Sequence, residues 1–518
     1  MSEQNTVEVE TAHGRVSGLV ADGTARFLGI PYAAAPAGDL LFAAPVPPEP
    51  WAGVRAAHTF GATAPKPPLG GRLGEIVSDP DVEGEEWLNL NVWTPDPAAS
   101  GLPVLVWIHG GGFTTGSSAV PSYDGATFAR DGLVCVSFNY RLGVYGFGCL
   151  PDAPAPANRG LLDQIAALNW VRENIAHFGG DPDNVTVAGE SAGAMSILAL
   201  LSRDDGLFHK AIVQSGTAHL GQTPADAGKV LKAVADELGV ESTAEALAGV
   251  DTEELLKAQG TVSADISQTP DADKYGASTM ASCGLSFMPV VDGDVLPRRP
   301  IDAIADGAGS GIPLLMGTTT EEFRLFVVTT ILVGWNLPAL YDKHLKAYSV
   351  PDGSWAEYKK GDTNAYPRDA ATGVACALLS DRMFRIPTYR VAEARAAIPD
   401  AARTHLYEFG WRSPVTPNNL QVKIGACHSV DLPFAWDTVA LADSKKLTGP
   451  NPPQALATAL HRTWADFAKT GQASWAAYDT TDRPVMTYAR NNNATTHQVV
   501  EDPRRSERTW WDGHPATS

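Results

Sequence analysis

The sequence predicts an α/β protein built on one large, mostly parallel sheet with helices on both faces. Short apolar runs recur through the first half of the chain and end near Gly, Ser or Asn, as buried parallel strands do; they cover 103–109, 133–138, 185–188 and 211–214. Between the second and third runs, apolar residues recur every three or four positions from Leu161 to Phe178, which is the period of one helix face. The alternation continues with apolar runs at 312–316 and 405–409 and a helical pattern over 455–469. This order of elements favours a parallel sheet covered by helices.

The chain has 518 residues, a length that would suit about three domains by size alone. No internal repeat or low-complexity block separates such units, and the Pro- and Gly-rich stretches 44–53 and 64–74 are typical of loops. We therefore expect a single domain over 1–518, with helical insertions at roughly 220–400 that form a cap over the active site.

The charge balance indicates which partners to expect. Lys and Arg number 39 and Asp and Glu 59, giving a net charge of −20, which repels nucleic acids and anionic membranes. The first residues do not resemble a secretory signal, and no run of 18 apolar residues occurs. The expectation is a cytoplasmic monomer or weak homodimer that acts on a small molecule, without a nucleic-acid or membrane partner.

The cysteines argue against structural cross-links and metal sites. The five cysteines are odd in number, scattered and never in a C-x-x-C spacing. We expect reduced thiols, no metal and no other cofactor.

A candidate nucleophile lies in the segment 189–193, Gly-Glu-Ser-Ala-Gly. The segment stands between an apolar β run and a helical run, the strand, turn, helix context of a nucleophile elbow. The nucleophile of such an elbow sits on a strained turn, and side chains in place of the flanking glycines would clash with the neighbouring strand and helix. The segment predicts Ser191 as the nucleophile.

A glycine-rich segment, His109-Gly-Gly-Gly-Phe113, follows another predicted strand. Acyl transfer needs backbone N–H groups aimed at the oxyanion of the tetrahedral intermediate, and glycines permit that close approach. A phosphate-binding loop is the alternative, but neither G-x-G-x-x-G nor G-x-x-x-x-G-K-[ST] fits this stretch. The two motifs complement each other, since one supplies a nucleophile and the other a site for the charge it creates.

An acid and a base are expected beyond the nucleophile, because the α/β-hydrolase fold orders its triad as Ser, then Asp or Glu, then His. Glu321 and Glu322 follow the apolar run 312–316 and are both candidates for the acid. Several histidines follow: His344, His405, His428, His461, His497 and His514. His405 begins a strand pattern and His461 lies in a helical one, whereas His428 follows a turn. Spacing alone does not choose among them.

Further segments point to a known family. They read FLGIPYA at 27–33, LNLNVWTP at 88–95, NYRLG at 139–143, NRGLLDQ at 158–164, FGGDP at 178–182 and QSG at 214–216. Together with the two motifs above, the chain resembles the type B carboxylesterase family, which includes the cholinesterases, almost from end to end. It is most similar to bacterial, actinobacterial-type carboxylesterases. The resemblance implies an α/β-hydrolase fold and serine ester hydrolysis.

The resemblance also implies roles for individual residues. The family's G-x-x-x-D-E-G stretch corresponds to 317–323, which makes Glu322 the acid, with Glu321 replacing the usual Asp. The family's G-A-x-H-x-x-E stretch corresponds to 425–431 and makes His428 the base. The same correspondence implies that the oxyanion hole is formed by the N–H groups of Gly111, Gly112 and Ala192.

The chain departs from the family at several positions. The family's E-D-C-L segment reads Glu-Glu-Trp-Leu at 85–88, so the disulfide of secreted members is absent, and Leu-Leu-Phe at 40–42 lacks the usual Arg. The aromatic acyl-pocket wall of acetylcholinesterases corresponds to positions near Cys283 and Leu285, which implies a wider acyl pocket. With Glu190, Phe113 and Phe287, these residues form the expected substrate pocket. Glu190 is either a source of negative potential for polar or cationic substrates or a hydrogen-bonded structural acid.

The expected activity is hydrolysis of short- to medium-chain esters, with aromatic esters as a further class, by a Ser-His-Glu acyl-enzyme mechanism. An amidase or aryl-carbamate hydrolase would use the same triad and is the alternative among enzymes. A non-catalytic cholinesterase-like binding module is the alternative from another class. The presence of Ser191, Glu322, His428 and the oxyanion glycines favours an enzyme.

Overall fold

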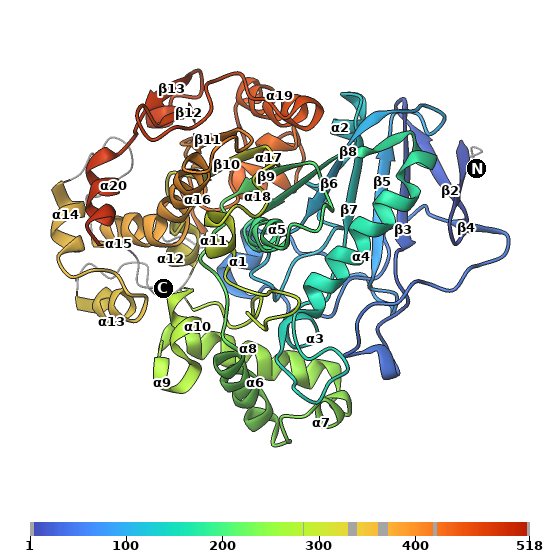
Figure 1. Cartoon of the computed structure of the whole chain (residues 1–518), viewed down its shortest axis with the longest axis horizontal. Helices are drawn as coiled ribbons and strands as arrows, with labels where there is room; N and C mark the ends of the chain where they lie inside the picture. Colours follow the sequence, from blue (N-terminus) through green and yellow to red (C-terminus); the bar gives the residue numbers. More distant parts are fainter. Residues whose placement is uncertain (1–4, 283, 330–338, 361–370, 418–421, 515–518) are drawn as a thin grey trace.

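The computed structural model describes residues 5–282, 284–329, 339–360, 371–417 and 422–514. A sheet of 13 strands forms its centre (Figure 1). Seven neighbouring strands run parallel, in the order β7 (Val134–Phe138), β6 (Leu102–Ile108), β8 (Gly180–Glu190), β9 (Lys210–Gln214), β10 (Leu314–Thr319), β11 (Thr404–Phe409) and β12 (Pro484–Tyr488). Nearly all of their residues are buried, because helices cover both faces, and this explains the uninterrupted apolar runs of the sequence. The predicted parallel sheet is confirmed.

Antiparallel strands extend both edges of this parallel block. On one side lie β5 (Asn89–Thr94), β3 (Thr24–Pro31), β2 (Gly14–Ala21) and β1 (Thr6–Thr11); on the other side lies β13 (His497–Glu501). The short β4 (Val54–Ala56) is the exception, since it pairs with β2 in parallel. The outermost strands β1, β2 and β13 are partly or wholly exposed, so their sequences show no continuous apolar run. Sequence analysis did not identify these strands for that reason, and it also missed the buried strands β3 and β5.

Helices pack against both faces of the sheet. On one face α4 (Arg159–Asn174), α5 (Ala192–Arg203) and α16 (Ile386–Ala396) contact the strands, and on the other α2 (Ala126–Arg130) and α19 (Gln454–Thr470) do. Alternate residues of β6 show the division, since Val104 and Val106 belong to one core cluster and Leu105 and Trp107 to the other. The predicted helices at 161–178 and 455–469 correspond to α4, with the turn that follows it, and to α19.

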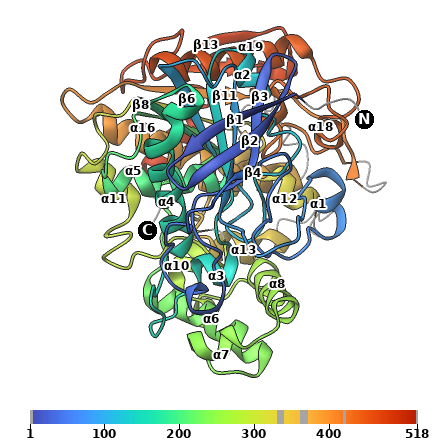
Figure 2. The same cartoon turned by 90° about the vertical axis from the view of Figure 1, so that its right-hand side faces the viewer.

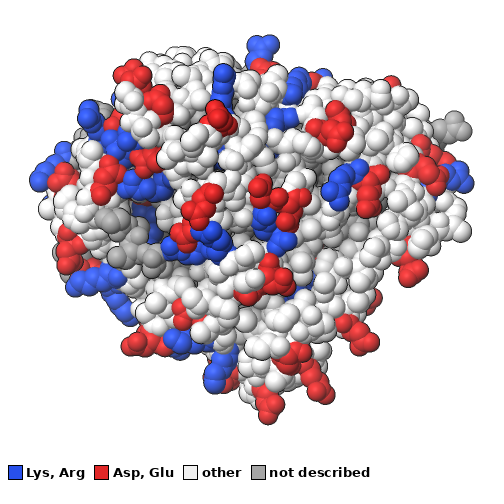
Figure 3. Space-filling view, viewed as in Figure 1, with Lys and Arg blue, Asp and Glu red and all other residues white. Residues whose placement is uncertain are grey.

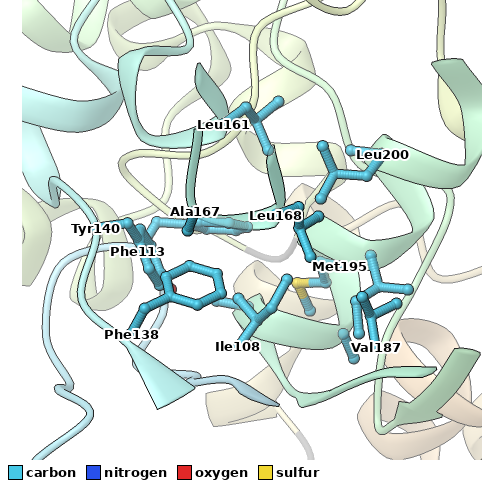
Figure 4. Packing of buried hydrophobic residues seen from close by; sticks show 14 of the residues in the cluster. Ile108, Phe113, Phe138, Tyr140, Leu161, Ala167, Leu168, Val187, Met195 and Leu200 are labelled. Atoms are coloured by element: carbon cyan, nitrogen blue, oxygen red, sulfur yellow. The ribbon is translucent and has the colours of Figure 1, made fainter. Parts of the chain in front are cut away.

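The first core cluster fixes the strands that carry the site. Figure 4 shows Ile108 of β6 and Val187 of β8 beneath Leu168 of α4 and Met195 of α5. All four side chains are buried. Because these strands and helices flank the two sequence motifs, their packing sets the positions of both motifs.

Most of the described residues between 220 and 400 are helical. They include α6 (Pro224–Leu238), α7 (Ala244–Ala248), α8 (Thr252–Gln268), α9 (Ala272–Tyr275), α10 (Ala277–Ala281), α11 (Pro300–Ala305), α12 (Arg324–Thr329), α13 (Ala339–Ala347), α14 (Ser354–Lys360), α15 (Ala371–Ser380) and the π-helical turn η3 (Asp381–Arg385). Figures 1 and 2 place α6, α7 and α8 together at the lower end of the molecule. The remaining helices are α1 (Gly71–Ile76), α3 (Gly143–Phe147), α17 (Leu432–Ala435), α18 (Ser444–Thr448) and α20 (Arg505–Asp512).

Three of the predictions concern a membrane-spanning helix, a metal site and cross-links between cysteines. Within the described ranges, no helix is long and apolar enough to cross a bilayer. The same residues contain no group of three His, Cys, Asp or Glu side chains arranged to hold a metal ion. Cys135, Cys149, Cys376 and Cys427 are buried free thiols, and Cys283 lies outside the described residues.

Candidate active site

The segment 189–193 forms a sharp turn between β8 and α5. Ser191 adopts φ 55° and ψ −124°, a conformation in which a side chain is strained. A Cβ on Gly193 would lie 2.0 Å from the carbonyl oxygen of Ile108, and one on Gly189 would lie 2.8 Å from the carbonyl carbon of Gly193. The glycines are therefore required for strand, turn and helix to approach, and the Ser191 side chain projects from the tip of β8.

The glycine-rich loop after β6 lies beside this turn. Gly111 and Gly112 have φ of 115° and 59°, and a Cβ on Gly111 would lie 2.1 Å from the carbonyl oxygen of Thr115. A Cβ on Gly110 would lie 3.1 Å from that of Ser191, so loop and serine are close neighbours. Within the described part of the chain, the N–H groups of Gly111 and Gly112 have no hydrogen-bond acceptor. Ala192 opens α5, where a helix leaves its N–H groups without internal acceptors.

A buried acid and imidazole lie at the ends of neighbouring elements. Nδ1 of His428 is 2.6 Å from Oε2 of Glu322, and the His428 N–H donates to the Glu322 carbonyl at 3.1 Å. The other carboxylate oxygen of Glu322 accepts hydrogen bonds from Ser215 Oγ at 2.6 Å and from the Thr319 N–H at 2.7 Å. The carboxylate is thereby held in one orientation toward the imidazole.

The structure distinguishes the two candidate acids. Oε2 of Glu321 accepts hydrogen bonds from the Ala426 N–H at 2.8 Å and from Arg412 Nε at 3.2 Å. Glu321 thus holds the loop that leads to His428, whereas Glu322 contacts the imidazole itself. Of the other candidate histidines, His405 lies in β11 and His461 in α19, where it pairs with Asp131.

Ser191 and His428 line the same cavity, of about 330 Å³. The glycine-rich loop forms one side of it, and its walls are largely apolar, with contributions from Leu69, Leu73, Ile76, Val77, Val120, Tyr123, Leu325, Phe326, Leu432, Pro433 and Leu447. The contribution of the segments 69–79 and 432–447 to the cavity was not predicted from the sequence, because they contain only short helices and connecting loops, which carry little periodic signal. A cavity of this size and lining suits a small, largely apolar substrate.

Comparisons with known proteins agree with this site. The model of the carboxylesterase family matches residues 4–507. The chain belongs to this family. It is 37% identical over 496 residues to para-nitrobenzyl esterase of Bacillus subtilis, covering 92% of this chain and 94% of that protein. It is 34% identical over 522 residues to phenmedipham hydrolase of Pseudarthrobacter oxydans, covering 96% and 98%.

Solved structures give the same result. A carboxylesterase of Geobacillus stearothermophilus matches with a TM-score of 0.82 and 35% identity, covering 97% of this chain and 99% of the other. A structure of PNB esterase matches with a TM-score of 0.80 and 34% identity, covering 97% and 98%. The α/β-hydrolase fold and the family resemblance are confirmed, and the enzyme is a carboxylic ester hydrolase.

The expected pocket residues occupy different places in the enzyme. Glu190 lines the cavity. Leu285, Phe113 and Phe287 do not line the cavity. Leu285 is partly buried, and its Cδ2 lies 3.6 Å from where a Cβ on Gly112 would be, so it lies beside the oxyanion loop. Phe113 has a left-handed backbone conformation, with φ 62°, and its ring packs in the core against Phe147 at a centroid distance of 4.8 Å. Phe287 is also a core residue, and Cys283 lies outside the described residues.

The outer nitrogen of His428 faces a second carboxylate. Nε2 is 3.0 Å from Oε1 of Glu190, which also accepts a hydrogen bond from Ser429 Oγ at 2.7 Å. No described residue gives Nε2 a hydrogen bond of good geometry, Ser191 included. The rings of Phe384 and Phe326 cover the imidazole at centroid distances of 4.8 Å and 5.3 Å.

Burial and neighbouring charges shift the titration of this group. Burial lowers the pKa of His428, but the carboxylates of Glu190 and Glu322 outweigh it and raise that pKa to about 9. Burial raises the pKa of Glu190 to about 7, against the opposing influence of His428. The two groups form one coupled pair that favours a shared proton.

Further polar residues that sequence analysis missed lie behind the acid. Asp431 accepts hydrogen bonds from Gln214 Nε2 and from the Tyr407 hydroxyl, both at 3.2 Å, and burial together with the charge of Glu322 raises its pKa to about 6. Trp464 in turn donates to Gln214 at 3.1 Å. Asp431 occupies the position of the final Glu in the family's histidine segment, which was the available signal.

Proposed function

We propose that the enzyme hydrolyses short- to medium-chain and aromatic carboxylic esters, with Ser191 as nucleophile, His428 as general base and Glu322 as the acid that orients it. One observation carries the proposal: Glu322 Oε2 holds His428 Nδ1 at 2.6 Å from within the protein, and the imidazole of His428 lines the cavity that also exposes Ser191. An imidazole held in this way keeps its proton on Nδ1 and leaves Nε2 to accept another.

The proposed reaction proceeds in two halves. Ser191 Oγ attacks the ester carbonyl while Nε2 of His428 accepts its proton, and the negative charge develops on the carbonyl oxygen. The N–H groups of Gly111, Gly112 and Ala192 stabilise that oxyanion. His428 then protonates the leaving alcohol, and an acyl-enzyme remains. Water, deprotonated by His428, attacks the acyl-enzyme and releases the acid.

The apolar cavity supports aromatic and short aliphatic substrates. The names of two relatives, para-nitrobenzyl esterase and phenmedipham hydrolase, point in the same direction. The second relative, matched over 96% of this chain, favours aryl-carbamate hydrolysis as a second candidate activity. Amide hydrolysis by the same residues is a further alternative, and matched ester, carbamate and amide analogues will distinguish the three.

The decisive experiment compares wild type with Ser191→Ala in hydrolysis of p-nitrophenyl acetate and butyrate, with mass spectrometry after treatment with diethyl p-nitrophenyl phosphate. We expect turnover and a covalent adduct in the wild type and neither in the variant. Ser122→Ala, which changes another serine lining the cavity, is the matched control and should keep the adduct. A folded wild type without turnover or adduct, or an adduct that persists in Ser191→Ala, would overturn the proposal.

We also propose a cytoplasmic location and a monomer or weak homodimer. The four buried free thiols are typical of a reducing compartment, which supports the location. Subcellular fractionation tests the location, and light scattering at several protein concentrations tests the oligomeric state. A stable higher oligomer would contradict the second expectation.

A further inference from the structure

A second cavity, of about 280 Å³, shares no lining residue with the cavity of Ser191. Its walls come from the segment after β9, from α11, from η3 and α16, and from α20. Six lining residues are apolar: Ile301, Ala305, Ile386, Pro387, Ala394 and Trp511. The other three are His219, Arg382 and Arg390, so the polar part of the lining is entirely basic or imidazole.

Arg382 is the central charge of this cavity. Its side chain is buried, with 5% of the residue exposed. Nε donates to the carbonyl of Tyr348 at 2.9 Å and Nη2 to that of Ala281 at 3.0 Å. No carboxylate of the described chain lies within ion-pair distance of Arg382, and Nη1 has no hydrogen-bond partner there. A buried guanidinium without a counter-charge is costly, so the position favours an anion.

The neighbouring acids do not neutralise this charge, because they are shared among other arginines. Arg390 contacts Glu393 and Asp512 at 2.7 Å each. Glu393 also pairs with Arg483 and Asp512 with Arg508, both at 2.6 Å. Arg508 also pairs with Asp502 at 2.7 Å, so three acids balance these three arginines. The uncompensated positive charge of the cluster is therefore that of Arg382, although the whole chain carries −20. In Figure 3, basic side chains interleaved with acidic ones gather over α11, α16 and α20.

His219 adds an open donor. Its Nδ1 is buried and has no hydrogen-bond partner among the residues described. Burial, and then the charges of Arg382, Arg299 and Arg390, lower its pKa to about 3, so the imidazole is neutral near pH 7. A neutral imidazole can donate one N–H group to an anion.

We infer that this cavity binds a small organic carboxylate, with its charged group between Arg382 and His219 and its apolar part against the walls of α11 and α16. Trp511 supplies a further apolar wall, since its Nε1 already donates to the Tyr358 hydroxyl at 2.7 Å. Apolar walls beside a single open guanidinium favour an organic monoanion over inorganic phosphate. The site stands apart from the ester-cleaving machinery, and its ligand belongs to the class of acid that ester hydrolysis releases.

Calorimetric titration of the full-length enzyme tests the inference, with benzoate as the probe. The enzyme is first treated with diethyl p-nitrophenyl phosphate, which occupies the Ser191 cavity. We expect saturable binding of one benzoate, at least about tenfold weaker binding in Arg382→Gln, and no comparable binding of neutral benzamide or of inorganic phosphate. Arg298→Gln is the matched control, because Arg298 pairs with Asp306 at the surface and does not line the cavity.

A second variant and a second measurement distinguish loss of the binding site from misfolding. Ala394→Phe fills the cavity without removing a charge and should abolish benzoate binding in a protein that melts as wild type does. In the wild type, benzoate should raise the pKa of His219, measured by NMR titration. If the organophosphate does not label the enzyme, the same titrations on untreated protein still report on this cavity, so failure of the proposed catalytic mechanism is separable.

The outcomes are distinct. Binding of butyrate as well as benzoate would make the product of p-nitrophenyl butyrate one source of the ligand, while binding of benzoate alone would point to another acid; both support a carboxylate site. No saturable benzoate binding, or binding that Arg382→Gln and Ala394→Phe leave unchanged, would overturn the inference.

Discussion

Nε2 of His428 lies 3.0 Å from Oε1 of Glu190, so the imidazole is flanked by carboxylates on both of its nitrogens. Glu322 contacts Nδ1, whereas Glu190 occupies the side on which a base must receive the proton of Ser191. The two carboxylates stabilise the imidazolium, and a protonated imidazole cannot act as a base. Glu190 therefore opposes the first step of the proposed mechanism near neutral pH.

Replacing Glu190 by Gln should shift activity to lower pH. The charge of Glu190 helps to raise the pKa of His428 to about 9, which favours the protonated imidazole near neutral pH. Without that charge the pKa falls, the neutral fraction at pH 7 rises, and the rising limb of kcat/KM moves toward acid. The profile is measured with p-nitrophenyl acetate. Asp236→Asn, an exposed acid, serves as control, and coincident limbs for wild type and Glu190→Gln would contradict the prediction.

Ser215→Ala should act mainly on kcat, with a smaller effect on the free energy of unfolding. Its hydroxyl is one of two donors to the carboxylate oxygen that faces away from His428, and a hydrogen bond to a charged group is worth about 1.5–3 kcal/mol. We expect kcat to fall about tenfold or more as Glu322 loses its orientation. Ser196→Ala removes another buried serine hydroxyl, which accepts from Gln164, and should leave kcat unchanged. Equal kcat values for the two variants would exclude the positioning role.

Gly111→Ala should impair catalysis severely. The new Cβ would lie 2.1 Å from the Thr115 carbonyl oxygen and would displace the loop that presents the oxyanion donors. Loss of one such donor lowers kcat about a hundredfold to a thousandfold. Gly53→Ala tests the contribution of positive φ alone, since Gly53 has φ 78° and open space around it. Comparable kcat values for both variants would argue against an oxyanion role for this loop.

Leu285 should limit the size of the acyl group that the enzyme accepts. Its Cδ2 lies 3.6 Å from the Cβ position of Gly112, and Leu285→Phe should therefore narrow the space beside the oxyanion loop. We expect the ratio of kcat/KM for p-nitrophenyl butyrate over acetate to fall in this variant and to rise in Leu285→Ala. Leu441→Ala changes an exposed leucine and is the control. A wild type that accepts acetyl esters alone would contradict the wider acyl pocket.

Stability should depend on the buried pair of Arg141 and Asp163. Both side chains are fully buried and joined at 2.8 Å. Asp163→Asn leaves an uncompensated guanidinium, and we expect the free energy of unfolding to fall by about 3–5 kcal/mol in urea titrations. Asp205→Asn, which breaks the more exposed pair with Arg203, should cost less than about 1 kcal/mol. A loss for Asp163→Asn no larger than that for Asp205→Asn would refute the prediction.

The sequence was most informative where one physical constraint dominates. Buried parallel strands must be apolar throughout, so β6, β7, β8 and β9 were recognisable as runs, whereas the half-buried strand β2 was not. The elbow at Ser191 was recognisable because its close contacts exclude side chains at two positions. In both cases the constraint restricts several consecutive residues and so leaves a recognisable motif, even where the contacting partner, such as Ile108 for Gly193, is distant in the sequence.

Features that depend on distant residues escaped sequence analysis. The hydrogen bond of Ser215 to Glu322 joins segments 107 residues apart, and that of Ser429 to Glu190 joins segments 239 residues apart. The choice of Glu322 over Glu321 came from the family resemblance and not from spacing. Phe113 was predicted to line the pocket, but its ring is packed in the core, and the sequence alone does not show on which side of the loop a left-handed residue places its side chain.

The contact between Gly193 and the Ile108 carbonyl, too close for any side chain, has a consequence for how this enzyme can evolve. Main chain touches main chain there, so the spacing between the serine turn and the oxyanion loop does not depend on the identity of surrounding side chains. The cavity walls, by contrast, are side chains from separate segments such as 69–79 and 432–447. Substrate range can therefore drift by exchange of wall residues while the reacting atoms keep their places, and a single scaffold can generate many specificities.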